Sequence, residues 1–449
     1  MSQRTFHLSP PPSPSLPIRA NDPGFSGGCM ELCGGRLVEA GEGSVLNGDP
    51  EALSALLEGD LARLRSILHT PKDANIRLEI KSDQLLWTSK KFGLWSLEYK
   101  RELTSPLCIA ATYGYTDCLR HILQCGAEVN LVPGPRSALQ QACANAHPHC
   151  VQLLLEHGAN PRLLSEEGLT SLHLCDSPHS FLCAKLLLSH QADINQLSDE
   201  EGTSPLHVAA EHGLVEHVLL YLRYGAKVDR VDSRGQTPLG SACAQPQSSG
   251  SQEAYHQVCQ LLMTHGADVN AVDGERATPL HRAARNANHA LVQLLLQHHA
   301  DVNAIDYNGS SPLRCALQSA VLKQELQPQC TVQTLLNHGS HRVWPGAFIK
   351  VLKSCAVSPQ TIEVLFNSYQ QIQVTEEWPE VVPEDILQVH WSFYKSLFAL
   401  ASRPRSLQHL CRFAARKLCG DQCQAIIPTL PVPRCLHGYL LLEPQGWVF

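Results

Sequence analysis

A repeated pattern with a period of about 33 residues is the feature that most constrains how this chain can fold. Each unit has a serine or threonine two positions before a leucine, and five of the seven units have a proline between the two. The hydroxyl can cap a helix, and proline suits the first helical position because its missing N–H would be unpaired there anyway. Each unit is therefore predicted to begin with a short helix. The anchor leucines are Leu107, Leu139, Leu172, Leu206, Leu239, Leu280 and Leu313.

The second half of each unit predicts another helix and then an extended finger. A glycine, or Gln191 or His299 in its place, follows the anchor leucine at one fixed distance in five units and at a longer distance in the other two. Glycine at this point ends a helix in the left-handed conformation. Units of this kind stack into a solenoid. The two longer gaps predict insertions between paired helices, at Gln245–Tyr255 and Gln318–Gln329.

The first helix of the unit carries a recognisable motif. Thr-Pro-Leu-His, or its serine variant, occurs at Ser204–His207 and Thr278–His281, whereas the Leu139 unit lacks the proline and has Gln140 for the histidine. With the period, this motif resembles the ankyrin repeat over roughly residues 104–340. The resemblance implies an all-α class, an ankyrin-repeat solenoid. Histidines at this phase are expected to hydrogen-bond the neighbouring finger, because side chains at repeat spacing along a stack do not converge on a metal.

Two further signals follow in order near the C-terminus. Leu407, Cys411 and Ala415 stand at i, i+4 and i+8, so they share one face of a helix that Ser406 can cap. Further along, Leu430-Pro431-Val432-Pro433 can neither be helical nor lie inside a sheet, because proline fixes φ and lacks a donor. A small-residue stripe followed by a stiff apolar proline hook resembles the SOCS box. With the repeats, the chain is similar to the ankyrin repeat and SOCS box family.

The resemblance implies a set of partners and a division of labour. In that family Leu407, Cys411 and Ala415 would contact elongin C of the elongin B/C pair, and the segment Leu430, Pro431, Val432, Pro433 would contact cullin-5 with its RING partner. The chain would then be a substrate receptor of a ubiquitin ligase, with the ankyrin array holding an unknown protein client. An ankyrin adaptor that recruits no cullin is the alternative, and changes in the proline hook discriminate the two.

The remaining segments complete the predicted organisation. Ala52–Leu68 has the pattern of a degenerate first repeat, whereas residues 71–103 do not fit the period, and Trp87, Trp95 and Tyr99 there are expected to be buried in an elaboration docked on the first repeats. The predicted parts are a disordered leader at 1–47, the degenerate repeat and elaboration at 48–103, ankyrin repeats at 104–343, degenerate capping helices at 344–400 and a small helical SOCS box at 401–449.

Catalytic and metal chemistry find no support in the sequence. There is no P-loop, GxSxG or HExxH motif, so we expect a non-catalytic protein without a cofactor. Cys411 is a poor thioester nucleophile because its helical phase commits it to an interface. The CxxxC pairs that begin at Cys29 and Cys419 lack a second pair of ligands nearby, and His147–Cys150 has no acidic neighbour.

Net charge and cysteine content limit the partners and the cellular compartment that we expect for this chain. A net charge of −7 argues against nucleic acid or an anionic membrane as the main partner. The 18 cysteines, without a secretory signal, predict thiols in a reducing compartment, hence the cytoplasm, with nuclear presence left open. Acidic residues at the finger tips have two interpretations, solvated turns or a surface for a basic client segment: Glu166, Glu167, Asp199, Glu200, Glu201, Asp229, Asp232, Asp273 and Glu275.

Overall fold

The computed structural model describes residues 50–448, except 91–93, 247–249 and 402. The side chains of residue 50 and of residues 80–101 lie outside that description. The predicted leader at 1–47 therefore falls outside the described residues. So do the side chains of Trp87, Trp95 and Tyr99, whose burial stays a prediction.

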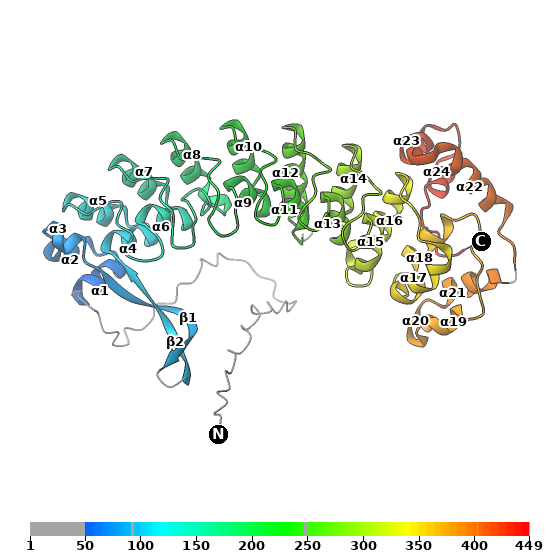
Figure 1. Cartoon of the computed structure of the whole chain (residues 1–449), viewed down its shortest axis with the longest axis horizontal. Coiled ribbons are helices and arrows are strands. Elements are labelled where there is room, and N and C mark those ends of the chain that lie inside the picture. The colour runs from blue at the N-terminus through cyan, green and yellow to red at the C-terminus, as the bar shows by residue number, and fades with distance from the viewer. Residues whose placement is uncertain (1–49, 91–93, 247–249, 402, 449) are drawn as a thin grey trace, which may run out of the picture. The chain divides into compact units, whose positions relative to one another are not determined.

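Pairs of short helices stack side by side through the middle of the chain and share one hydrophobic core (Figure 1). The predicted solenoid of ankyrin type is confirmed. The pairs are α4 (Pro106–Tyr113) with α5 (Thr116–Gln124), α6 (Ala138–Ala144) with α7 (Pro148–Glu156), α9 (Pro205–Glu211) with α10 (Val215–Arg223), α11 (Pro238–Ala244) with α12 (Gln252–Thr264), α13 (Pro279–Arg285) with α14 (His289–Gln297), and α15 (Pro312–Ser319) with α16 (Pro328–Asn337).

The predicted start and stop signals act as expected. The hydroxyls of Ser105, Thr237 and Ser311 each accept a hydrogen bond from the backbone N–H of the third residue of their helix. The glycine position after each second helix has positive φ, including the non-glycine residues Gln191 (62°) and His299 (64°). The tertiary stack therefore imposes the left-handed ending even where a side chain disfavours it.

One unit departs from the predicted pattern. Residues 171–174 form a turn instead of a helix, and only the second helix of that unit, α8 (Phe181–Ser189), is regular. The residue before a proline avoids the helical region, and Ser177, which precedes Pro178, is extended at φ −124° and ψ 154°. Pro178 therefore shortens the segment, and the residues before it form a single turn instead of a helix.

Two hydrogen-bond ladders join neighbouring units. The predicted histidine ladder is present: the Nε2 atoms of His173, His207 and His281 lie 2.9, 3.0 and 3.0 Å from carbonyl oxygens of the following finger. Asparagines at the base of the fingers form a second ladder that the sequence analysis did not identify. Asn270, for example, donates to His299 O at 3.3 Å and accepts from Asp301 N at 2.7 Å. Asn130, Asn195 and Asn303 make the same pair of bonds.

The N-terminal elaboration contains a β-hairpin, which the all-α prediction did not include. Strands β1 (Leu78–Lys90) and β2 (Leu94–Thr104) pair antiparallel, with Leu78 opposite Thr104 and an irregularity between Lys81 and Leu85. Helices α1 (Pro50–Glu58), α2 (Leu61–Ile67) and α3 (Pro71–Ala74) precede the hairpin. Its base lies against the repeats, since a side chain at Gly134 would stand 1.8 Å from Leu103 O.

The C-terminal part is helical and packs on the last repeats. A buried aromatic group centres on Phe348, which stacks on Trp378 at 5.3 Å between ring centroids. None of the helices in the described part of the chain is long and apolar enough to cross a membrane. The elements are α17 (Phe348–Cys355), α18 (Pro359–Asn367), α19 (Trp378–Val381), α20 (Glu384–Val389), α21 (Trp391–Phe398), α22 (Leu407–Cys419), α23 (Cys423–Ile426) and α24 (Arg434–Leu440).

Candidate functional site

Helix α22 exposes an apolar face. Ser406 caps it as predicted, because the hydroxyl accepts from His409 N. Leu407 and Leu418 are 77% and 90% exposed, and Leu410 and Cys411 between them are also exposed. Leucine side chains exposed to solvent this close together leave an apolar surface that a partner would bury. Leu410 and Leu418 were missed by the sequence analysis, although their i+3 and i+11 spacing from Leu407 could have identified them.

The opposite face of α22 is buried and cationic. Arg412 and Arg416 are only 3% and 7% exposed, and His409 is fully buried. The Arg412 guanidinium lies 4.3 Å from the centre of the Tyr439 ring, a cation–π contact. The pKa of Arg416 is lowered to about 10, and burial is the largest cause of this shift. The apolar face of α22 therefore points outward because its arginines are committed to the interior.

The predicted elongin-facing residues lie on or beside this exposed face. Leu407 and Cys411 are exposed, whereas Ala415 is half-buried at the edge of the face. Ala414, one residue earlier, is exposed in its place. The helical stripe thus passes slightly to one side of the line that a strict i+4 spacing suggested, as expected for 3.6 residues per turn.

The proline hook forms a short bent segment directly before α24, in which Val432 N donates to Leu430 O at 2.8 Å. Leu430 and Pro433 have ψ of 140° and 146°, in the polyproline region. Pro431 and Pro433 are exposed, whereas Leu430 and Val432 are half-buried. The His437 ring contacts Leu430 O at 3.0 Å, which fixes the segment against the helix that follows. The hook is therefore presented in one conformation, and docking on it orders few additional torsions.

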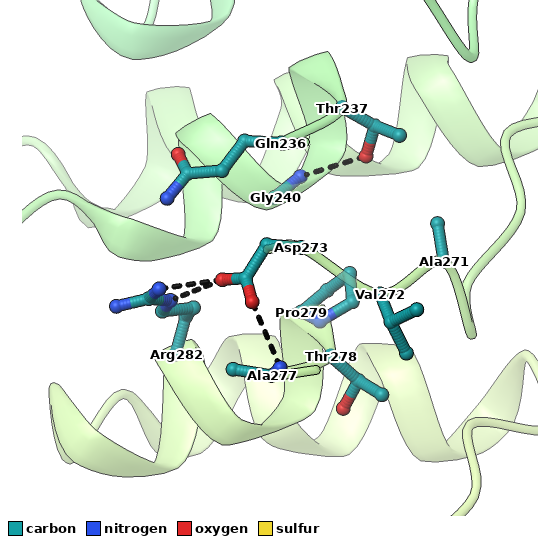
Figure 2. Close-up of a pocket in the computed structure, with 10 residues that line it drawn as sticks. All are labelled: Gln236, Thr237, Gly240, Ala271, Val272, Asp273, Ala277, Thr278, Pro279 and Arg282. Atoms are coloured by element: carbon teal, nitrogen blue, oxygen red, sulfur yellow. Dashed lines mark hydrogen bonds and ion pairs between the residues drawn. The ribbon is translucent and has the colours of Figure 1, made fainter. Parts of the chain in front are cut away.

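The acidic residues at the finger tips fall into two groups, those that cap turns and those that are exposed. Asp232 is buried, and its Oδ1 accepts from Arg234 N at 2.9 Å and Gln236 N at 2.7 Å. Asp273 caps its own turn in the same way and also binds the Arg282 guanidinium (Figure 2). These two carboxylates stabilise turns instead of meeting a client. The acidic residues at 199–201 are exposed.

The hollow in Figure 2 results from a missing side chain. Gly240 stands where three other units have the ladder histidine, and a small gap of ≈10 Å³ lies between it and the finger of Asp273. That volume is about one water-sized sphere. In the described part of the chain, no group of three or more His, Cys, Asp or Glu side chains is placed to hold a metal ion.

Comparisons with known proteins agree with this architecture. The family model for ankyrin repeats matches residues 107–198, 179–273 and 249–342, and the model for the SOCS box matches residues 403–441. The chain is 50% identical over 407 residues to ankyrin repeat and SOCS box protein 18 of Homo sapiens, covering 89% of this chain and 87% of that protein. It is 42% identical over 398 residues to protein 16 of the same family from Mus musculus, with 89% and 87% covered.

The fold and its C-terminal helices define an ankyrin solenoid joined to a SOCS box, the class of protein in which a repeat array is followed by this short box. Because these relatives match along most of their length as well, the chain belongs to the ankyrin repeat and SOCS box family. Membership of this family is consistent with a substrate-recognition adaptor of ubiquitin ligases.

Proposed function

We propose that this chain is the substrate-recognition subunit of an elongin B/C–cullin-5 RING ubiquitin ligase. The apolar face of α22, with Leu407, Cys411 and Ala415, docks on elongin B/C. The hook of Leu430, Pro431, Val432 and Pro433 docks on cullin-5 with its RING partner. The ankyrin array holds a protein client, and the complex works in the cytoplasm, as the thiol-rich composition predicts.

The observation that carries this proposal is the polarity of α22. An amphipathic helix normally turns its leucines inward and its charges outward, whereas here Leu407 and Leu418 face water and Arg412 and Arg416 face the protein. A helix with outward-facing anchors at i, i+3, i+4 and i+11 suits a hydrophobic groove on a partner. The contribution to ubiquitin transfer is then positional, because holding client and ligase together raises the effective concentration of the reacting groups.

Co-purification with elongin B/C tests the proposal. A proline at Leu407 would be uninformative, because Leu407 is the first residue of α22 and proline is tolerated there. Leu407→Asp is better, since a carboxylate in the first turn favours the helix while it removes the apolar anchor. We expect this variant to retain less than roughly a tenth of the bound elongin.

The neighbouring exposed residue gives a matched control. Gln408→Asp adds the same charge one position later and off the apolar face, so elongin should remain bound. Equal elongin recovery by Leu407→Asp and by the unaltered chain would refute the docking assignment. The adaptor alternative predicts that the unaltered chain captures no cullin and that changes in the hook affect none of its interactions, whereas the proposed receptor loses cullin-5 capture when the hook is changed.

A further inference from the structure

The hairpin of β1 and β2 is the finger of the degenerate first repeat, and it is longer than the fingers that follow. In the next units a backbone bond joins one finger to another, as when Glu166 N donates to Pro135 O at 2.9 Å. Leu103 of β2 stands at the same phase as Pro135, four positions before an anchor leucine, and its carbonyl oxygen lies against Gly134 of the next finger. The base of the hairpin is thus the first member of the row of fingers.

Beyond this base the hairpin extends away from the helices (Figure 1). Residues 94–103 of β2 span roughly 30 Å at the rise of an extended chain. The sheet consists of β1 and β2 alone, so each strand has an outer edge of backbone N–H and C=O groups that no other described strand pairs. A two-stranded hairpin is only marginally stable by itself, whereas three or more strands are stable. The outer edges are therefore places where another strand would add.

Of the two strands, β2 has the edge that suits pairing. The ladder is irregular between Lys81 and Leu85, where β1 contains extra residues opposite β2. Irregularities of this kind bend a strand and protect its edge. By contrast, β2 contains neither proline nor glycine. We call residues 94–100 of β2, which lie beyond the contact with Gly134, the β2 edge.

The β2 edge is self-complementary when two copies run antiparallel about a two-fold axis at Leu97. This axis pairs every residue of the edge, because Leu97 is its midpoint. Trp95 of each copy then falls opposite Tyr99 of the other, and Leu97 falls opposite itself. These three positions alternate with polar ones, so they share one face of the ribbon. Aromatic pairs directly across neighbouring strands stabilise a sheet.

The charges of β2 oppose most other registers. An axis at any charged residue would set two like charges directly opposite each other, which destabilises a strand pair. This applies to Glu98, Lys100, Arg101 and Glu102. With the axis at Leu97, Glu98 falls opposite Ser96 and Lys100 falls opposite Leu94, so no like charges are directly opposed.

The remaining registers are limited by space and by length. An axis at Tyr99 would set Leu94 of the second copy opposite Thr104, and its hairpin tip would then meet the finger that holds Gly134. An axis nearer the tip than Leu97 would pair fewer residues. The pattern of the β2 edge therefore favours a second copy of this chain as its partner, in one register.

We propose that two copies of this chain associate through the β2 edge and form a four-stranded antiparallel sheet with its two-fold axis at Leu97. The pairing joins two arrays through their first fingers and supplies hydrogen bonds to both edges. Helix α22 and the proline hook take no part, so the inference is independent of the proposed docking on elongin B/C. A stretch this short buries less than the roughly 1,600 Å² of a standard interface, so association should be reversible and depend on concentration.

Sedimentation velocity of the full chain at several concentrations tests the inference. The average mass of the unaltered chain should rise with concentration towards twice that of one chain. Leu97→Glu and Leu97→Lys, each measured alone, should associate at least roughly tenfold more weakly, because like charges then meet on the axis. An equal mixture of the two variants should restore association, since opposite charges then face each other, and misfolded variants would not produce this recovery.

Two further comparisons control for the strand and for the register. Thr88→Lys adds the same charge on β1, across the ladder from Ser96, and should leave association unchanged. Tyr99→Glu and Tyr99→Lys should each weaken association, and their mixture should not restore it, because these positions lie apart when the axis is at Leu97.

Several outcomes would overturn the inference. These are a constant mass of the unaltered chain at all concentrations, association that survives both Leu97 variants, and a mixture of those variants that stays dissociated. Recovery in the Tyr99 mixture would contradict the register, and association that appears only after removal of residues 1–47 would make that segment the occupant of the edge. Elongin is absent from this assay, so its failure leaves the docking test on α22 unaffected.

Discussion

Arg416 donates a hydrogen bond from Nη1 to Asn337 Oδ1 at 2.6 Å, although the two residues are 79 positions apart. The first lies on α22 of the SOCS box and the second ends α16 of the last full repeat. Asn337 in turn donates to Leu441 O at 3.0 Å. Polar side chains therefore join the SOCS box to the array, where an apolar contact alone would leave the two free to slide.

Removing this arginine should loosen the SOCS box. Arg416→Ala would leave three buried acceptors without their donor, Asn337 Oδ1, Leu336 O and Leu440 O. We expect a loss of roughly 3 kcal/mol in the free energy of unfolding, because each buried acceptor left without a donor costs about 1–3 kcal/mol. Urea denaturation measures the loss, and hydrogen exchange should locate it in α22 and α24.

Lys417→Ala is the control for that loss, because Lys417 is the next residue and is exposed. Its effect should stay within about 0.5 kcal/mol. Equal stability of the Arg416→Ala and Lys417→Ala variants would show that the junction does not depend on the arginine.

Acidification should destabilise the same junction through His409. Its Nδ1 accepts from Arg405 and Arg412, at 2.6 and 2.9 Å, while Nε2 faces Tyr369 O at 2.9 Å and Gln370 O at 3.2 Å. Burial first, and then the two guanidinium groups, lower the pKa of His409 to about 4. The unfolded chain, with a histidine pKa near about 6.5, binds more protons in this range, so stability is full above pH ~6.5 and falls towards pH ~4.

The measurement is the urea midpoint at several pH values between 7.5 and 4.5. His409→Gln should lower stability at neutral pH and flatten the decline below pH ~6.5, because one titrating group has been removed. An equally steep decline in this variant would show that other groups cause the acid sensitivity. His173 and His217 are examples, because burial also lowers the pKa of each to about 4.

Filling the gap beside Gly240 should stabilise the array. Gly240 lies within α11, and an added Cβ would meet only Thr237 Oγ1, at an ordinary 3.6 Å. Gly240→Ala should therefore gain about 0.5–1 kcal/mol from reduced backbone entropy. Thermal melting measures the gain.

Gly225 provides the contrasting case for that measurement. It also has open space around its Cβ position, but its φ is +81°. Gly225→Ala should cost about 1–2 kcal/mol, since a side chain disfavours the left-handed region. If both substitutions shift the melting temperature in the same direction, the free space around each glycine, and not its backbone conformation, would determine the effect.

Replacing the proline hook should separate the two docking partners. In a chain with alanine at Leu430, Pro431, Val432 and Pro433, we expect cullin-5 capture to fall while elongin B/C stays bound, because α22 is unchanged. Client binding by the array should persist. A pull-down scored for both partners decides the matter: joint loss of elongin and cullin would make the hook a folding element of the box.

The repeat architecture could be predicted because its signals are local. Ser105 and Thr237 cap their helices from within the same turn, and Gly225 and Gly266 end theirs by their own conformation. The hairpin was missed although Trp95–Lys100 alternates apolar and polar residues, because that region was compared with the helical period alone. Period-two alternation was the available signal.

The arrangement of the docking site depended on tertiary contacts that no local pattern reveals. Helical phase placed Leu407 and Cys411 on one face, but it could not show that Arg412 and Arg416 occupy the opposite, buried face. An arginine is ordinarily expected to face water. The acceptors that make burial possible, such as Asn337 Oδ1 and Leu336 O, come from a helix far earlier in the chain.

The inverted polarity of α22 also bears on how much of this protein a cell can hold. A chain that hides its arginines and shows its leucines has an adhesive surface until something covers it. On the proposed docking of α22, molecules in excess of the covering partner are the ones that chaperones and proteases meet first. Abundance is then matched to the supply of that partner by surface chemistry, without any dedicated sensor of stoichiometry.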